Sequence, residues 1–298
     1  MAGTTIKPLV LVVSGAGVTG LTVLKGLARS GAWVSSPSRS NYRIPRTNGF
    51  FSDCRQRLAA TVRPTSIDKP EVAPLRELGV DVRPCDWQKQ GPAELDELFS
   101  GVDIVISTTY WSPDVLLDQK MLVDAAKRMN VKRFIPNDFG TPAPPGVMML
   151  QDTVGICIFV LSCYEAYSDL QKSQIRKYIK EQDIPYTFID VGFWMQISVP
   201  YRPGTPGVMA PLVRGFYGDG NTKSAVTNKD HIGDFVARII ADPRTLNQHI
   251  LVHEDEVSQN EIYEVCNRVT GEDFHKYKEP VRTSTVYLIH VILILHIP

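Results

Sequence analysis

The stretch that decides the fold is Val10-Leu11-Val12-Val13-Ser14-Gly15-Ala16-Gly17-Val18-Thr19-Gly20, near the start of a chain of 298 residues. An apolar strand pattern runs directly into a complete G-x-G-x-x-G. A helical pattern follows, with apolar residues at Val18, Leu21, Leu24 and Ala28. A strand, a glycine turn and a helix in this order form a cradle for the pyrophosphate of a dinucleotide. The stretch therefore predicts nucleotide binding, and an incidental glycine turn is the alternative.

Each residue of the motif has an expected role in that cradle. Gly15 permits the tight turn, Gly17 lets backbone N–H groups approach the phosphates, and Gly20 lets the helix pack closely on the strand. Val18 and Thr19 lie in the first helical turn, where the partial positive charge of the helix attracts an anion. We therefore predict that all five residues bind the cofactor.

Strand-like apolar runs alternate with helical patterns through the first half of the chain. Such alternation predicts an α/β fold with a doubly wound parallel sheet of the Rossmann type. Ligands bind such sheets at the carboxyl ends of the strands, which makes Thr108 and Thr109 candidate cofactor neighbours, with core packing as the alternative. The strand-like runs are 9–14, 58–62, 80–85, 102–108 and 133–136, and the helical patterns are 18–29, 70–78, 93–99 and 113–129.

Composition and charge exclude several classes of function. The 32 basic and 32 acidic residues cancel, so no net field attracts nucleic acid or a membrane surface. The five cysteines are scattered and form no C-x-x-C, which favours a reduced, cytoplasmic protein. The six histidines show no metal-ligand spacing, so we expect no metal site. The apolar run 286–297 is too short to span a bilayer.

Arg63 is the residue that we expect to select the cofactor. It follows the second predicted strand, where an NAD-dependent enzyme usually holds an acidic residue for the ribose 2′-hydroxyl. A guanidinium offers planar donors to a 2′-phosphate instead, which favours NADPH/NADP. Lys69 lies just beyond and can add a donor. An exposed arginine in a turn is the alternative interpretation.

Several further segments make the chain resemble the NmrA-like family, and within it the isoflavone-reductase-like NADPH-dependent reductases, an atypical branch of the short-chain dehydrogenases. The resemblance runs through most of residues 8–280. It implies a Rossmann domain over 1–150, and the rest of the sheet with a smaller, truncated substrate lobe over 151–298. Besides the glycine motif, the matching segments are 60–64, 78–82, 103–107, 131–140, 172–176, 184–188 and 230–235.

The resemblance also assigns roles to single residues. Lys172, at the start of a K-x-x-I-R helix, matches a lysine beside the nicotinamide ribose and the substrate, which acts as a general acid or base or orients both. Phe139 matches an aromatic residue beside the nicotinamide, and Phe193 matches the loop that closes over the substrate. In the family, a lysine in the loop that corresponds to that of Lys69 assists cofactor binding. The residues alone also allow a solvated lysine on a basic helix and two core aromatics.

The function that the resemblance implies is an NADPH-dependent oxidoreductase that reduces a small aromatic or conjugated metabolite. Such a protein acts on a small molecule, without nucleic acid or membrane, as a monomer or a homodimer. The rival is a non-catalytic, NADP-sensing regulatory protein of the NmrA type. Lys172 favours the enzyme, because such sensors need not retain this lysine. A third reading is a decayed product that binds nothing.

Three stretches depart from the family pattern: 33–57, 154–170 and 282–298. The first is rich in Arg, Ser, Pro and Asn, and the second is a dense apolar run with two of the five cysteines. When these two are removed in thought, the flanking sequence rejoins in register. At the third, the chain ends where the family continues. Translated introns explain all three, and genuine insertions with a natural C-terminus are the alternative. Transcript sequencing distinguishes the two.

Overall fold

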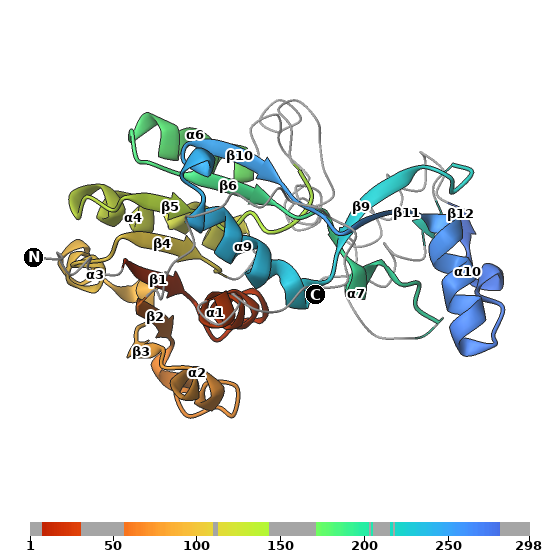
Figure 1. Cartoon of the computed structure of the whole chain (residues 1–298), viewed down its shortest axis with the longest axis horizontal. Coiled ribbons are helices and arrows are strands. Elements are labelled where there is room, and N and C mark those ends of the chain that lie inside the picture. The colour runs from red at the N-terminus through yellow and green to blue at the C-terminus, as the bar shows by residue number, and fades with distance from the viewer. Residues whose placement is uncertain are drawn as a thin grey trace, which may run out of the picture. The chain divides into compact units, whose positions relative to one another are not determined.

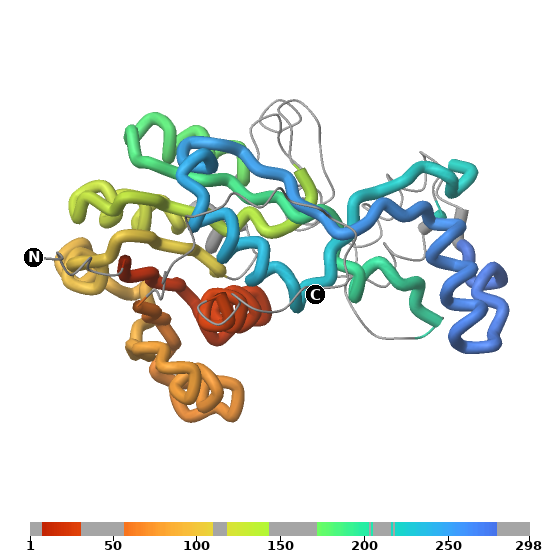
Figure 2. Tube along the Cα trace, in the orientation of Figure 1, coloured from red at the N-terminus to blue at the C-terminus, as the bar shows by residue number. Residues whose placement is uncertain are grey.

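The chain divides into two units that are each assembled from separate segments. Unit 1 comprises Met1–Asp138, Gln174–Ile189 and Asp230–Ile250, and unit 2 comprises Phe139–Ser173, Asp190–Lys229 and Leu251–Pro298. The three anomalous stretches lie outside the described residues, apart from Arg57. The computed structural model describes residues 8–30, 57–109, 113–142, 171–202, 204, 215–216 and 218–280 (Figures 1 and 2).

A five-stranded parallel sheet forms the centre of unit 1, in the order β3-β2-β1-β4-β5 (Figure 1). From β1 the sheet extends one way through β2 and β3 and the other way through β4 and β5. The predicted Rossmann-type sheet is confirmed, and each strand ends within two residues of its expected bounds. The strands are β1 (Leu9–Val13), β2 (Arg57–Val62), β3 (Asp81–Pro84), β4 (Ile104–Ser107) and β5 (Arg133–Ile135).

Helices cover both faces of this sheet because β1 is apolar on both sides. Leu9, Leu11 and Val13 pack in one core with residues of three helices, α3 (Pro92–Phe99), α4 (Pro113–Arg128) and α6 (Gln171–Glu181). Alternation sends Val10 and Val12 to the opposite face. There α1 (Val18–Ser30) packs beside α9 (Ile232–Ala241) (Figure 1), and their backbones meet at Gly26 and Gly233. A short helix, α2 (Ala73–Glu77), precedes β3.

Two further strands continue unit 1 beyond β5. An isolated parallel bridge joins Phe134 of β5 to Tyr186, just before β6 (Thr187–Asp190). The N–H of Phe134 donates to the carbonyl oxygen of Pro185 at 2.8 Å. β6 in turn pairs with β10 (Gln248–Leu251). The segment that enters β6 therefore follows the edge of the sheet.

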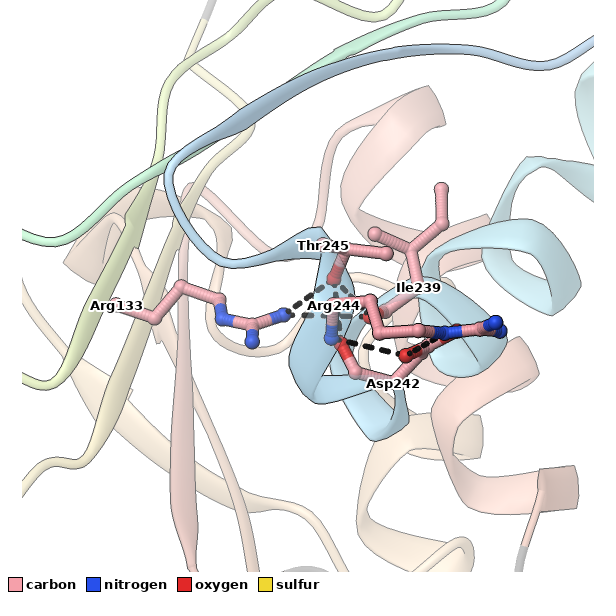
Figure 3. Close-up of polar contacts among 5 residues, drawn as sticks. All are labelled: Arg133, Ile239, Asp242, Arg244 and Thr245. Atoms are coloured by element: carbon pink, nitrogen blue, oxygen red, sulfur yellow. Dashed lines mark hydrogen bonds and ion pairs between the residues drawn. The ribbon is translucent and has the colours of Figure 1, made fainter.

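Buried Arg133, the first residue of β5, fastens the end of α9 (Figure 3). Its Nη1 donates to the carbonyl oxygen of Ile239 at 3.2 Å and to Oγ1 of Thr245 at 3.1 Å. The cation thereby meets a carbonyl in the last turn of a helix, where orphan acceptors concentrate. Beside it, Asp242 accepts hydrogen bonds from the side chain and the backbone N–H of Arg244. These bonds lower the pKa of Asp242 to about 2.

The described residues of unit 2 form short strands, one long helix and a short one. The long helix, α10 (Gln259–Thr270), begins with a capping box of Ser258 and Glu261 and ends at Gly271, whose φ is 71°. A three-stranded sheet has the order β11-β9-β7, and β12 pairs with β8. The strands and the short helix described in this unit are β7 (Phe193–Trp194), α7 (Met195–Ser198), β8 (Gly215–Phe216), β9 (Lys223–Thr227), β11 (Asp255–Ser258) and β12 (Glu279–Pro280).

Candidate cofactor site and active site

The glycine turn and the end of β4 lie side by side where the strand order of unit 1 changes direction. β1 pairs with β4 in parallel, with Val13 opposite Ser107. The N–H of Thr108 donates to the carbonyl oxygen of Val13 at 3.0 Å, and Oγ1 of Thr108 donates to the same oxygen at 2.8 Å. Open parallel sheets bind ligands at such a switch point, outside the carboxyl ends of the strands. This edge of unit 1 is the candidate cofactor site.

The three glycines of the motif meet two different steric requirements. A Cβ on Gly20 would come within 2.7 Å of the backbone of Gly15, and a Cβ on Gly15 would come within 2.7 Å of Cβ of Ala60. Both glycines therefore permit close packing of α1, β1 and β2. Gly17 is exposed, and within the described chain a Cβ there would approach backbone oxygens of Ser14 and Thr108 no closer than 3.4 Å. Gly17 thus leaves the open backbone that a phosphate cradle needs.

The left-handed residue of the glycine turn is Ser14. Ser14 has a φ of 63°, a conformation that crowds Cβ against the backbone in residues with a side chain. Its N–H donates to Oγ1 of Thr61 at 2.9 Å, and its Oγ accepts from Nε1 of Trp87 at 3.2 Å. Its carbonyl oxygen accepts from Oγ1 of Thr108 at 3.4 Å.

Val18 and Thr19 begin α1 directly after this turn. The helical spacing predicted that Val18 belongs to the apolar face of α1. This prediction is wrong, because Val18 is 59% exposed. That face centres on Val23, Leu24 and Leu27. Leu24 is buried as the spacing predicted, whereas Leu21 and Ala28 are half-buried and Val18 begins the helix in solvent. The first N–H groups of a helix have no partner within it and can bind an anion.

Arg63 and Lys69 lie just beyond the carboxyl end of β2, the strand next to the glycine turn. The N–H of Gly15 donates to the carbonyl oxygen of Thr61 at 2.9 Å, two residues before Arg63. Arg63 is exposed and precedes a short 3₁₀ helix over Pro64–Ser66. The N–H of Lys69 donates to the carbonyl oxygen of Ser66 at 3.3 Å, and its side chain is exposed as well. Both cations are accessible to an anionic ligand.

Thr108 and Thr109 are buried at the end of β4, and a residue after β5 supports them. Nδ2 of Asn137 donates to the carbonyl oxygen of Thr109 at 2.7 Å. The N–H of Asn137 donates to Oε1 of Gln119 at 3.0 Å. Asn137 was not among the predicted site residues. The available signal was its place directly after a strand, the same signal that identified the two threonines.

In unit 2, Lys172 is a buried cation in the first turn of α6. Its Nζ lies 3.8 Å from Oδ1 of Asp190 and donates to the carbonyl oxygen of Thr141 at 3.5 Å. The Lys172 side chain is 5% exposed and that of Asp190 is 0% exposed. Lys172 is therefore not the solvated lysine that its basic neighbours allow. Asp190, the last residue of β6, was missed because one acidic residue after an apolar strand is a weak signal.

The segment that carries Phe139 is held in place within unit 2. The carbonyl oxygen of Gly140 accepts from the N–H groups of Val191 and Gly192 at 2.9 and 3.1 Å. Nε1 of Trp194 donates to the carbonyl oxygen of Phe139 at 3.0 Å. Phe139 is buried, whereas Phe193 is half-buried. Residues 139–141 therefore link the predicted aromatic residue to the carbonyl that holds Lys172.

The predicted site residues thus form two groups, each held by its own unit. Unit 2 contains Phe139, Lys172 and Phe193. Unit 1 contains Gly15, Gly17, Val18, Thr19, Gly20, Arg63, Lys69, Thr108 and Thr109.

The described residues were also searched for metal sites and membrane spans. They contain no group of three or more His, Cys, Asp and Glu side chains that could hold a metal ion. None of their helices has the length and apolar character needed to cross a membrane. The two cysteines among them, Cys85 and Cys266, are free thiols, and burial raises the pKa of each.

Comparison with known proteins identifies the family. The sequence matches the NmrA-like family over residues 7–293.

An asnovolin J 5′,6′-dehydrogenase of Aspergillus novofumigatus is 32% identical over 276 residues, 88% of this chain and 69% of the relative. The isoflavone reductase homolog P3 of Arabidopsis thaliana is 28% identical over 232 residues, 74% of this chain and 69% of the relative. A leucoanthocyanidin reductase–NADPH complex from Vitis vinifera has a TM-score of 0.62 at 22% identity, covering 92% of this chain and 77% of that chain. The family resemblance seen in the motifs is confirmed, and this chain belongs to the NmrA-like family.

Proposed function

We propose that this chain is an NADPH-dependent oxidoreductase that reduces a small aromatic or otherwise conjugated metabolite. The observation that carries the proposal is the open backbone at Gly17, at the switch point between β1 and β4. The relatives support it: one is a dehydrogenase, one is an isoflavone reductase homolog, and the leucoanthocyanidin reductase structure is a complex with NADPH.

The residues of unit 1 suit NADPH. Gly17 leaves room for phosphate oxygens, and the start of α1 offers N–H donors to them. The exposed guanidinium of Arg63 can donate to a 2′-phosphate in a planar fork, and Lys69 adds a point charge. NADPH supplies a hydride when it is bound. The task of these residues is to bind and orient the dinucleotide.

Lys172 is the proposed proton donor to the substrate. Asp190 and the carbonyl oxygen of Thr141 hold its Nζ within unit 2, so the ammonium is positioned in a buried setting. Its charged form can donate a proton to a substrate atom that gains negative charge during reduction. Phe139 and Phe193 are the proposed aromatic contacts for cofactor and substrate.

Steady-state NADPH oxidation over a panel of aromatic and conjugated compounds tests the proposal. Lys172→Met should lower kcat by about 10²-fold to 10⁴-fold, because a general acid contributes that much, and should leave the Kd for NADPH within about twofold. Lys177→Met is the matched control, since Lys177 is exposed on the same helix, and it should leave kcat unchanged. If the parent binds NADPH but oxidises it with no compound, the enzyme proposal fails and the NADP-sensing regulator replaces it.

The proposal includes compartment and assembly. Free thiols such as Cys85 and Cys266 suit a reducing environment, so we place the protein in the cytoplasm. We propose a monomer or a homodimer that acts on small molecules and binds neither nucleic acid nor membrane. Sedimentation equilibrium measures the assembly, and a larger stable oligomer would contradict it.

A further inference from the structure

We propose that Thr61, Trp87 and Thr108 form a clamp that holds Ser14 in its left-handed conformation and so shapes the glycine turn for the cofactor. This Ser14 clamp rests on the proposed function, and Trp87 serves in it as a positioning residue. The clamp lies within unit 1, and all four of its residues are described.

Ser14 adopts a conformation that serine does not prefer. Its φ of 63° lies in the region that favours glycine, since Cβ crowds the backbone there. A strained residue of this kind persists where its surroundings impose it, and such residues concentrate at functional sites. The chain therefore needs contacts that keep Ser14 from relaxing to a negative φ.

The contacts to Ser14 come from β2 and from the segments that follow β3 and β4, and they reach each of its polar atoms. Thr61 of β2 accepts from its N–H, and Trp87 beyond β3 donates to its Oγ. The hydroxyl of Thr108 beyond β4 is shared: it donates mainly to the carbonyl oxygen of Val13 at 2.8 Å and lies 3.4 Å from the carbonyl oxygen of Ser14. The exposed fractions of Thr61, Trp87 and Thr108 are 1%, 4% and 5%. A buried indole N–H needs an acceptor, and Ser14 Oγ is the one it has. One bond thus satisfies the indole and restrains the serine.

The conformation of Ser14 determines the course of the turn as far as Gly17. The N–H of Gly17 donates to the carbonyl oxygen of Ser14 at 3.1 Å. A change of φ at Ser14 would rotate that carbonyl and displace the open backbone proposed to receive the phosphates. Small displacements of preorganised donors are costly for binding and catalysis. The clamp therefore acts on cofactor affinity through the turn, without touching the cofactor.

A double-mutant cycle of Trp87→Phe and Ser14→Gly tests the clamp by NADPH calorimetry. Trp87→Phe keeps an aromatic ring but removes the N–H, and should raise the Kd about tenfold. Ser14→Gly alone removes the strain and should keep the Kd within about threefold. Trp87→Phe combined with Ser14→Gly should bring the Kd back to within about twofold of the parent, because glycine adopts a positive φ without help.

The rescue separates a positioning role from a packing role. If Trp87 mattered only for its volume, the loss in Trp87→Phe would persist beside Ser14→Gly. Phe99→Leu is the control, because Phe99 belongs to the same buried cluster as Trp87 and has no polar atom. It should lower the unfolding midpoint and leave the Kd unchanged. An unchanged Kd in Trp87→Phe, or no rescue by Ser14→Gly, overturns the clamp.

Urea unfolding of the same four proteins separates this proposal from the proposed function. The midpoint should fall on Trp87→Phe when residue 14 is serine, and much less when it is glycine. If the parent does not bind NADPH, the proposed function fails and the positioning role fails with it, while the unfolding cycle still shows whether the clamp exists. If the parent binds and the cycle is additive in both measurements, the clamp alone is overturned.

Discussion

At the scale of single residues, burial distinguishes two Arg–Asp ion pairs of unit 1. Arg176 lies one turn after Lys172 on α6, and its Nε donates to Oδ2 of Asp138 at 2.8 Å. The side chains of this pair are 10% and 2% exposed. A second Arg–Asp pair of similar length, Arg29 with Asp234 at 2.9 Å, has side chains that are 42% and 29% exposed. The chain therefore contains a buried and an exposed Arg–Asp pair of similar length, which can be compared directly.

Arg176→Met should lower the free energy of unfolding by about 3 kcal/mol or more, because it leaves the buried carboxylate of Asp138 without its guanidinium. Arg29→Met is the matched control and should cost less than about 1 kcal/mol, since exposed pairs contribute little. Urea unfolding at pH 7 measures both. Equal losses of unfolding free energy in the two variants would show that burial does not determine how much the Arg176–Asp138 pair contributes to stability.

Single residues also show where sequence reasoning stops. The glycine motif and Arg63 were found because their residue types and spacing carry the chemistry themselves. The strain at Ser14 and its bond to Trp87 could not be predicted, since 73 residues separate the partners and neither residue type announces the contact. Asp190 was missed for the same reason, because only the folded chain places it near Lys172.

At the scale of elements, the strands of the parallel sheet and the helices between them were predictable, and the two-residue strands of unit 2 were not. The five strands of the parallel sheet and α1 to α4 have apolar patterns that repeat. β7, β8 and β12 have two residues each, which is too few to show any period, so tertiary contacts alone define them. The sequence accordingly predicted only a smaller substrate lobe within 151–298, without its individual strands.

Asp242, at the end of α9, should make the free energy of unfolding depend on pH in the acid range. Its pKa of about 2 lies below the value near 3.9 of an unfolded chain. A carboxyl group whose pKa folding lowers stabilises the protein above the unfolded pKa, and that contribution is lost as the pH falls through the folded pKa. Asp242→Asn should therefore destabilise the protein equally at pH 7 and at pH 5.

The difference between the parent and Asp242→Asn should then narrow from about pH 4 towards about pH 2, as the parent carboxyl takes up its proton. Urea unfolding across this range gives the comparison. A difference that stays constant into the acid range would show that the charge of Asp242 contributes no stability.

At the scale of the whole molecule, the chain has a parallel sheet with a candidate cofactor site in unit 1 and a buried lysine in unit 2. The family and the Rossmann-type fold followed from the order of many short motifs, each weak alone. The sequence did not decide whether residues 33–57 are a translated intron or a genuine insertion. Their composition marks them as unusual, but it does not show whether the protein needs them.

A chain that lacks residues 33–56 tests whether that stretch is needed. α1 ends at Ser30 and β2 begins at Arg57, and helix-to-strand connections of about 2–6 residues are common. The remaining residues 31 and 32 should therefore suffice, and the shortened chain should fold and bind NADPH as the full chain does. Circular dichroism and calorimetry measure the two properties. Loss of either would assign the stretch a structural role.

The central claim is that this chain binds NADPH through the glycine turn and Arg63, and calorimetric titration of the purified chain with NADPH and NADH tests it most directly. We predict that NADPH binds at least about tenfold more tightly than NADH, since a charge-assisted contact to the 2′-phosphate contributes about 1.5–3 kcal/mol. Arg63→Ala should remove that preference while leaving NADH binding unchanged. Preference for NADH, or no binding of either dinucleotide, would contradict the account.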